Sequence, residues 1–447
     1  MSDVLAGPLH RPLLRLALPM FAGYVFQMGF NYVDTFLVGG LGPEALAAVG
    51  GSMFVVWALF AFAEVVSVGV LARVARAAGA GRGDEVGAAL AGGALVGLGL
   101  TAVVVAAVPL GAVEGLVAAM GIEAGVAALA TDYLRILFLG FPALLAFCLL
   151  ESVFRGAGDA RTPMLAVSCA FLLNAVLDVV LIFGLGPIPA LGVAGAALAS
   201  VTARAVGVAL LAAALVLRRR ALGLGRPAPG WQAPARLLGL VRIGAPSSAA
   251  GLSFCLIYLG LVRITAGFGT AAVAALGLGI RLEGLAYFAL IALGRAAGVM
   301  AGQNLGAAQP ERAWAAVRRA EALGYLAMVP ATAALLLVPE PLVILFSDDP
   351  AVVEAASLYL RIVALALFPY VKEIVLDNVA AGVGDTVPAM VVEGLGTLLR
   401  LPIALALAAL GLGYAAVWWS VAATMLLKAA AFEVWFRRGT WAERTLD

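Results

Sequence analysis

Twelve apolar stretches of this 447-residue chain are each long enough to cross a lipid bilayer. A membrane-spanning helix needs about 20 mainly apolar residues, and the connections between the stretches are too short to hold a separate soluble domain. The sequence therefore predicts an all-α integral membrane protein with twelve transmembrane helices. We expect them at residues 14–38, 45–71, 87–110, 131–154, 162–184, 191–217, 240–264, 270–300, 315–338, 356–380, 387–410 and 412–436.

The composition excludes a soluble enzyme. Hydrophobic residues make up 64% of the chain and charged residues 12%, whereas soluble domains hold roughly 45–50% apolar and about 25% charged residues. His10 is the single histidine, the three cysteines lie apart, and no Gly-x-x-x-x-Gly-Lys phosphate loop occurs. Histidine metal clusters, Ser-His-Asp triads and ATP hydrolysis of that type are therefore excluded. We expect no enzyme, no cofactor, no metal centre and, with a net charge of +2, no nucleic-acid partner.

The placement of arginine predicts the orientation in the membrane. Basic residues occupy alternate connections, such as those containing Arg76, Arg161 and Arg219, and the connections between these hold no Lys or Arg. The positive-inside rule then places both termini in the cytoplasm. An even number of spans agrees with this, because it places both termini on the same side.

The two halves of the chain repeat one another. Tyr133–Ile136 recurs as Tyr359–Ile362, and Gly156–Asp159 recurs as Gly382–Asp385 with Val383 in place of Ala157, both at the same offset along the chain. Six spans per half make these parallel repeats, a design found in secondary transporters with a cavity between the halves. We expect an N-lobe at 1–217, a cytoplasmic linker at 218–239 and a C-lobe at 240–447.

Three motifs resemble those of multidrug and toxic compound extrusion (MATE) transporters. They are Val33–Thr35 with Leu41–Ala47, the Arg-Gly-Ala-Gly-Asp-Ala-Arg loop within Phe154–Met164, and the Gly-Gln-Asn-Leu-Gly-Ala motif Gly302–Ala307. The resemblance implies two six-helix lobes forming a V and a monomer in the inner (cytoplasmic) membrane of a bacterium or archaeon. It also implies efflux of amphipathic, often cationic, organic compounds, driven by a proton or sodium gradient.

Four polar residues of the first half are predicted at bilayer depth, where charge is costly and commonly functional. Asp34 in the first span and Asp178 in the fifth lie at similar depth, Asn174 is one helical turn before Asp178, and Thr202 lies in the sixth span. Such a cluster can take up a proton or ligate a small cation. Alternatively, Asp34 is solvated at the outer interface, and Asn174 and Asp178 only join helices by hydrogen bonds.

The resemblance assigns these residues a role. Asp34, Asn174 and Asp178 match the N-lobe cation-coupling residues of the DNA-damage-inducible (DinF-type) branch, so coupling to H⁺ is expected and Na⁺ at these three residues is an alternative. Thr202 completes the set, although a small difference in loop length would make Ser200 the counterpart.

Further residues are expected around a substrate cavity. We expect substrate contacts from Gln27, Asn31, Glu151 and Glu283, although Glu151 could instead line an inner vestibule or join helices. Pro19 removes a helix hydrogen bond in the first span and is expected to act as a hinge; a tolerated kink is the alternative.

The second half lacks the acid pair. At the repeat offset Asp34 corresponds to Leu261, Asn174 to Arg400 and Asp178 to Ala404, which favours coupling through the N-lobe. Other charges remain in this half, and they predict an ion-paired structural network, with a switch or a second substrate surface as the alternative. They are Arg281, Glu283, Lys372, Glu373 and Arg400.

The sequence as a whole favours a proton-coupled multidrug antiporter. The alternatives are a Na⁺-coupled exporter of the same family and a flippase of lipid-linked oligosaccharides of the same superfamily. Small organic cations and the lipid bilayer are the expected partners.

Overall fold

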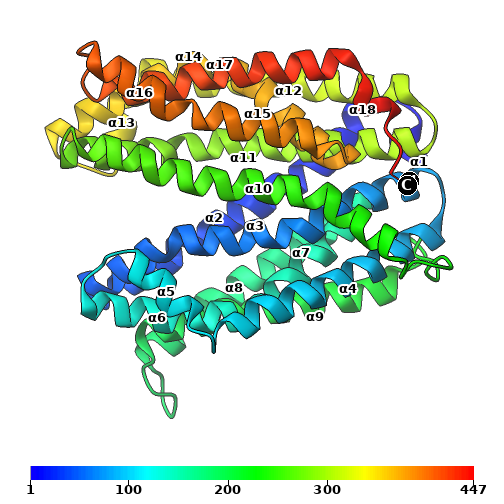
Figure 1. The fold of residues 1–447 in the computed structure, drawn as a ribbon, viewed down its shortest axis with the longest axis horizontal. Coiled ribbons are helices and arrows are strands. Elements are labelled where there is room, and N and C mark those ends of the chain that lie inside the picture. The colour runs from blue at the N-terminus through cyan, green and yellow to red at the C-terminus, as the bar shows by residue number, and fades with distance from the viewer. Residues whose placement is uncertain (1, 447) are drawn as a thin grey trace. The chain divides into compact units, whose positions relative to one another are not determined.

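Helices make up all of the regular secondary structure that the computed structural model describes, which covers residues 2–446 without the side chains of Ser2, Asp3 and Asn31 (Figure 1). The helices are α1 (Ser2–Leu5), α2 (His10–Gly39), α3 (Pro43–Gly79), α4 (Gly83–Ala107), α5 (Ala112–Ala119), α6 (Ala124–Leu139), α7 (Phe141–Gly156), α8 (Arg161–Phe183), α9 (Gly192–Arg218), α10 (Pro234–Ala266), α11 (Thr270–Gly306), α12 (Pro310–Leu337), α13 (Pro339–Ile344), α14 (Pro350–Val383), α15 (Thr386–Leu398), α16 (Arg400–Ala409), α17 (Ala415–Arg438) and α18 (Thr440–Glu443).

The described helices match the predicted spans. Eleven are long and apolar enough to cross a membrane, and there are twelve if α6 and α7 form one span bent by 49°. The bend follows from the sequence at the joint. Pro142 cannot donate the backbone hydrogen bond of a continuous helix, and a Cβ atom on Gly140 would lie 2.3 Å from Val201 of α9, so only glycine fits there.

The chain divides into two compact units. The N-terminal unit contains residues 18–248, and the C-terminal unit contains residues 2–17 and 249–446. The divisions within α2 and α10 fall beside Pro19 and Pro246, one proline inside each helix. These prolines occupy equivalent places in the two halves of the repeat.

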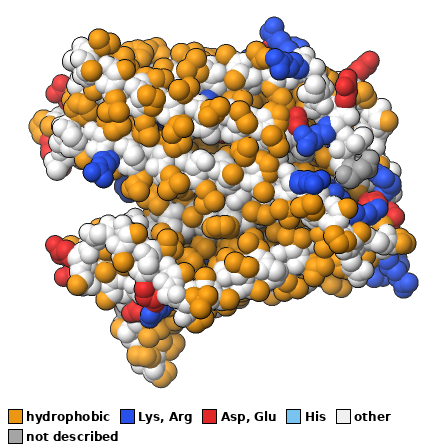
Figure 2. All heavy atoms as spheres, viewed as in Figure 1, with side chains coloured by type: hydrophobic (Ala, Val, Ile, Leu, Met, Phe, Trp, Pro, Cys, Tyr) orange, Lys and Arg blue, Asp and Glu red, His pale blue; other side chains and the backbone are white. Residues whose placement is uncertain are grey.

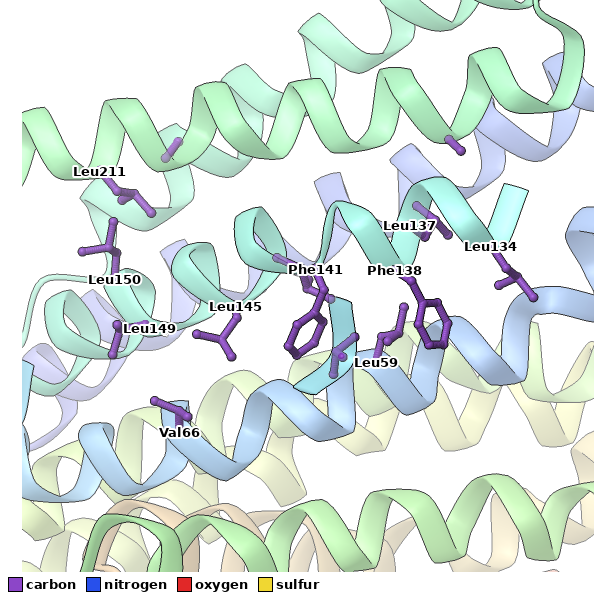
Figure 3. Packing of buried hydrophobic residues seen from close by; sticks show 14 of the residues in the cluster. Leu59, Val66, Leu134, Leu137, Phe138, Phe141, Leu145, Leu149, Leu150 and Leu211 are labelled. Atoms are coloured by element: carbon purple, nitrogen blue, oxygen red, sulfur yellow. The ribbon is translucent and has the colours of Figure 1, made fainter. Parts of the chain in front are cut away.

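Each unit has its own core. In the N-terminal unit α3 packs against α4, α6 and α7, and α9 packs against α6, α7 and α8. Figure 3 shows Leu59 and Val66 of α3 beside Phe138 of α6 and Leu145 of α7. In the C-terminal unit α14 packs against α11, α12 and α17, and most of its residues are buried.

The exterior of both units is apolar. Figure 2 shows hydrophobic side chains along the flanks of the helices, with most of the visible Lys and Arg side chains gathered at the right-hand ends. Large residues such as Phe36, Leu217 and Leu410 are more than 70% exposed. In water this surface would aggregate, so its natural surroundings are lipid.

Each unit has an equivalent salt bridge between an arginine and a glutamate side chain. Arg135 binds Glu114 in the N-terminal unit, and Arg361 binds Glu340 in the C-terminal unit. The repeat offset converts the first pair into the second. A backbone hydrogen bond, and after it the hydrogen bond from Arg135, lower the pKa of Glu114 below its usual value. Both pairs are exposed, so they contribute little to stability.

A second pair repeats at the same offset. Arg218 Nη1 lies 2.7 Å from Asp159 Oδ2, and Arg444 forms the equivalent ion pair with Asp385. Asp159 also accepts hydrogen bonds from the backbone N–H groups of Arg161 and Thr162, which fixes the start of α8. In each half of the repeat, the aspartate of the Gly-x-Gly-Asp loop thus joins the loop to an arginine near the end of that half, Arg218 or Arg444.

Two nearby glycines on α11 give a test of this packing. A Cβ atom on Gly279 would lie 2.2 Å from the ring of Tyr359, whereas nothing lies within 4 Å of one on Gly277. We expect Gly279→Ala to lower the free energy of unfolding by about 1–3 kcal/mol through overpacking. Gly277→Ala is the control and should be neutral or stabilising, since Ala is the better helix former. Unfolding in detergent measures both; equal stability of the two variants would contradict the close approach.

Candidate functional site

A buried acidic centre lies within the N-terminal unit. Asp34 of α2 is 6% exposed, and Asn174 and Asp178 of α8 are fully buried. The four-residue spacing of the latter two places them on one helix face, and Asn174 Nδ2 donates a hydrogen bond of 3.3 Å to Asp178 Oδ1. The burial of Asp34 contradicts the alternative of a solvated residue at the interface.

The two carboxyl groups lie close enough to interact electrostatically. The buried Tyr133 of α6 interacts with both of them. Among the described groups, Asp34 Oδ1 and Asp178 Oδ2 are buried and accept no hydrogen bond. Buried polar oxygens are normally hydrogen-bonded, and exceptions often mark function. The centre therefore has the capacity to bind a proton or a cation.

Arg204 of α9 is a basic neighbour that the sequence reasoning missed. It interacts electrostatically with Asp34, and its guanidinium carbon lies 5.4 Å from the ring centre of Phe30 and 5.6 Å from that of Phe60. The signal was present in the sequence, since Arg204 stands alone in the middle of an apolar helix. Arginines at helix ends report topology, whereas one at mid-helix needs a partner inside the protein.

The remaining predicted coupling residue lies elsewhere. Thr202 is exposed, whereas Ser200, two residues earlier on α9, is 3% exposed. The geometry thus favours Ser200 as the buried hydroxyl of this helix. Gln27 is exposed, Pro19 lies inside the continuous helix α2, and the side chain of Asn31 lies outside the part of the chain that the structure describes.

Glu151 is held in an ion pair of its own. Arg155, one turn later on α7, approaches it to 2.7 Å, and both side chains are largely buried. The Arg155 guanidinium also lies over the ring of Tyr24 at 5.7 Å. This geometry joins Glu151 to its own helix and to α2.

The C-terminal unit holds a buried network of both charges. Tyr359 donates a hydrogen bond of 3.0 Å to Glu283 Oε2. Arg400 donates to the Tyr258 hydroxyl at 3.1 Å and to Thr424 Oγ1 at 3.0 Å, and it interacts electrostatically with Glu283. Glu283 thus already interacts with Tyr359 and Arg400 of its own unit.

Lys428 extends this network. Its ammonium group lies 2.5 Å from Glu373 and 2.9 Å from Glu393, and its side chain is 4% exposed. Lys372, by contrast, binds Glu321 and Glu433 and is 27% exposed. Arg281 is exposed.

The centres of the two units occupy equivalent positions of the repeat but differ in their residues. Tyr133 and Tyr359 are related by the repeat offset, and each borders the buried charges of its unit. The same offset relates Asn174 to Arg400 and Thr202 to Lys428. Where the first unit has an amide and a hydroxyl, the second has two cations.

The donor set of the acidic centre suits a proton or a hard cation. Carboxylate and amide oxygens are the ligands that hard cations prefer. Among the described residues, no three His, Cys, Asp or Glu side chains converge in a way that could hold a metal ion. A coupling cation would therefore rely on Asp34, Asp178 and the amide of Asn174.

The two lysines of the chain test the C-terminal network. Lys428→Met leaves Glu373 buried without its cation, and breaking a buried pair in this way costs about 3–5 kcal/mol. We expect a loss of that order in the free energy of unfolding in detergent. Lys372→Met is the matched control and should lose clearly less, because Lys372 is partly solvated. A larger loss in the control would contradict the network's structural role.

Comparisons with known proteins agree with this architecture. The family model described as MatE matches residues 19–180 and 246–406. "Probable multidrug resistance protein NorM" of Thermotoga maritima is 27% identical over 441 residues, covering 98% of this chain and 94% of that protein. The "FAD transporter" of Shewanella oneidensis is 31% identical over 378 residues, covering 82% and 80%. The structure of a MOP superfamily transporter from Pyrococcus furiosus is 24% identical, has a TM-score of 0.90 and covers 99% and 98%.

The structural similarity confirms the predicted all-helical fold. The family match has one segment in each half of the chain, and the first contains Asp34, Asn174 and Asp178. Because the relatives are named as transport or resistance proteins, the expectation of a transporter and not an enzyme is also confirmed. The chain belongs to the MatE family of multi-pass membrane transporters.

Proposed function

We propose that this protein exports amphipathic organic cations in exchange for protons, and that Asp34 and Asp178 couple the two movements as in the DinF-type branch. The observation that carries this proposal is the pair of buried carboxyl groups, each with an oxygen that accepts no hydrogen bond from the described groups. A buried carboxylate oxygen without a hydrogen-bond donor is unfavourable. Protonation or cation binding removes that cost, so occupancy of the centre has an energetic consequence.

Protonation also changes the hydrogen bonds that the centre can make. An ionised carboxylate only accepts hydrogen bonds, whereas a protonated carboxyl group also donates one. Asp34 and Asp178 stand on different helices, α2 and α8, so this change alters how the two helices are joined. Pro19 lies fifteen residues before Asp34 on α2 and supplies a place where that helix can bend.

The proposed substrate class rests on the names of the relatives and on the residues predicted to contact substrate. The NorM protein of Thermotoga maritima is named as a multidrug resistance protein. Gln27, on α2 with Asp34, is exposed and available for contact with an organic compound. We propose a bacterial or archaeal inner membrane, a monomer, and both termini in the cytoplasm, since the basic residues gather in the connections on that side.

Carboxamide variants test the coupling. Asp34→Asn and Asp178→Asn retain the shape of the side chain but cannot be ionised. We expect each to lower proton-driven efflux of a fluorescent organic cation from proteoliposomes at least tenfold. Asp348→Asn, in an exposed loop, is the control and should transport normally. Wild-type rates in both variants would contradict the proposal.

Separate gradients identify the driving ion. We expect efflux to follow an imposed pH gradient and to persist when Na⁺ is replaced by K⁺. Transport that follows only the sodium gradient would favour the Na⁺-coupled alternative. Flipping of a lipid-linked oligosaccharide without efflux of the fluorescent cation would favour the flippase.

A further inference from the structure

The connection between α8 and α9, residues 184–191, has no polar side chain. Its sequence is Gly-Leu-Gly-Pro-Ile-Pro-Ala-Leu, and the nearest charged residues along the chain are Asp178 and Arg204. The connection between α4 and α6, at the same end of the N-terminal unit, carries Glu114 and Glu123. The composition of residues 184–191 therefore differs from that of a neighbouring connection whose charges need water.

The apolar side chains of this connection are exposed. Leu185 is 64% exposed, and Ile188 is exposed as well. Both continue a row of exposed apolar residues on one face of α8, spaced four, three and four positions apart. The row consists of Leu172, Val176, Val179 and Phe183. Since the apolar exterior of the unit lies in lipid, the connection extends a surface that already contacts the bilayer.

The connection projects across the direction of the helices. In Figure 1 it is the green hairpin at the lower left, which extends away from the helices of its own unit. The same projection in Figure 2 shows hydrophobic side chains and no charged ones. Because the helices cross the bilayer, a segment that projects across their direction extends along the plane of the membrane.

The backbone of the hairpin satisfies most of its own hydrogen-bond donors. Leu185 and Ile188 each donate an N–H bond of 3.2 Å to the carbonyl group of the other, and Gly184 and Leu191 donate to carbonyl groups at the end of α8. The two prolines have no N–H group. A lipid-exposed backbone must meet its hydrogen bonds without water, and this hairpin largely does so.

Two N–H groups of the hairpin are left over. Those of Gly186 and Ala190 donate none of the described hydrogen bonds. The two legs are also pressed together, because a Cβ atom on Gly184 would lie 2.8 Å from the backbone nitrogen of Ala190. The hairpin therefore combines a stiff apolar body with two free donors, which suit the ester and phosphate oxygens at the boundary of the hydrocarbon region.

We propose that residues 184–191 form a membrane anchor in the leaflet opposite the arginine-rich connections. Leu185 and Ile188 lie among the acyl chains, and the N–H groups of Gly186 and Ala190 meet headgroup oxygens. The partner of this surface is the lipid bilayer. The anchor goes beyond the proposed function, since it depends neither on the driving ion nor on the compound that is transported.

An environment-sensitive fluorescent label tests this position in proteoliposomes. The three native cysteines are replaced by Ala, and the label is attached to Ile188→Cys or to the matched control Glu123→Cys. We expect aqueous iodide to quench the label at residue 188 at least about fivefold less than that at residue 123, because the hydrocarbon region holds no water to carry the ion. Lipids with a nitroxide on the acyl chain should quench only the label at residue 188.

Hydrogen–deuterium exchange of the unmodified chain in lipid nanodiscs is a second measurement and needs no variant. The N–H groups of Ile122 and Glu123, like those of Gly186 and Ala190, donate none of the described hydrogen bonds. We expect Gly186 and Ala190 to exchange more slowly than Ile122 and Glu123, because the bilayer limits their contact with water.

Three results would overturn the anchor. Equal iodide quenching at residues 188 and 123 would place the hairpin in water. Shielding of the label at residue 188 from both iodide and the nitroxide lipids would mean that protein, such as a second copy of this chain, covers the hairpin. Exchange at Gly186 and Ala190 as fast as at Ile122 and Glu123 would exclude protection by lipid. All three are measured without transport, so they are distinct from failure of the coupling proposal.

Discussion

A charge buried within the membrane must find its partner inside the protein, because neither lipid nor bulk water is available to solvate it. This constraint organises both units. In the C-terminal unit it is met by direct contacts, in which Lys428 binds Glu373 and Glu393 and Tyr359 binds Glu283. In the N-terminal unit it is met only in part, since Asp178 has Asn174 as a partner and Arg204 acts on Asp34 from a distance.

The repeat distinguishes the contacts that both units share from those that differ between them. The ion pairs Arg135–Glu114 and Arg218–Asp159 recur at the repeat offset as Arg361–Glu340 and Arg444–Asp385. These pairs belong to the frame of each unit. The buried centres do not recur, since Asn174 corresponds to Arg400. The two aspartates Asp34 and Asp178 of the first unit correspond to the apolar residues Leu261 and Ala404 of the second.

Much of this could be predicted from the sequence, because spans and repeats depend on pattern alone. Hydrophobic length predicted the helices, and a four-residue spacing was enough to join Asn174 to Asp178. The choice between Thr202 and Ser200 could not be predicted from the sequence. Side chains two positions apart on a helix point roughly 200° apart, and only the packing of the helices decides which one is buried. The electrostatic effect of Arg204 on Asp34 depends on which residues of α2 and α9 lie close together, and the apolar pattern of each helix does not predict this.

The difference between the two centres also bears on which of them can respond to an ion. Glu373 and Glu393 of the C-terminal network are ion-paired with Lys428, so a proton bound to either would weaken that ion pair, although one oxygen of each accepts no hydrogen bond. Asp34 Oδ1 and Asp178 Oδ2 also accept no hydrogen bond, and the described ion pairs include neither of these two aspartates. A proton bound there removes a desolvation cost without breaking an existing contact.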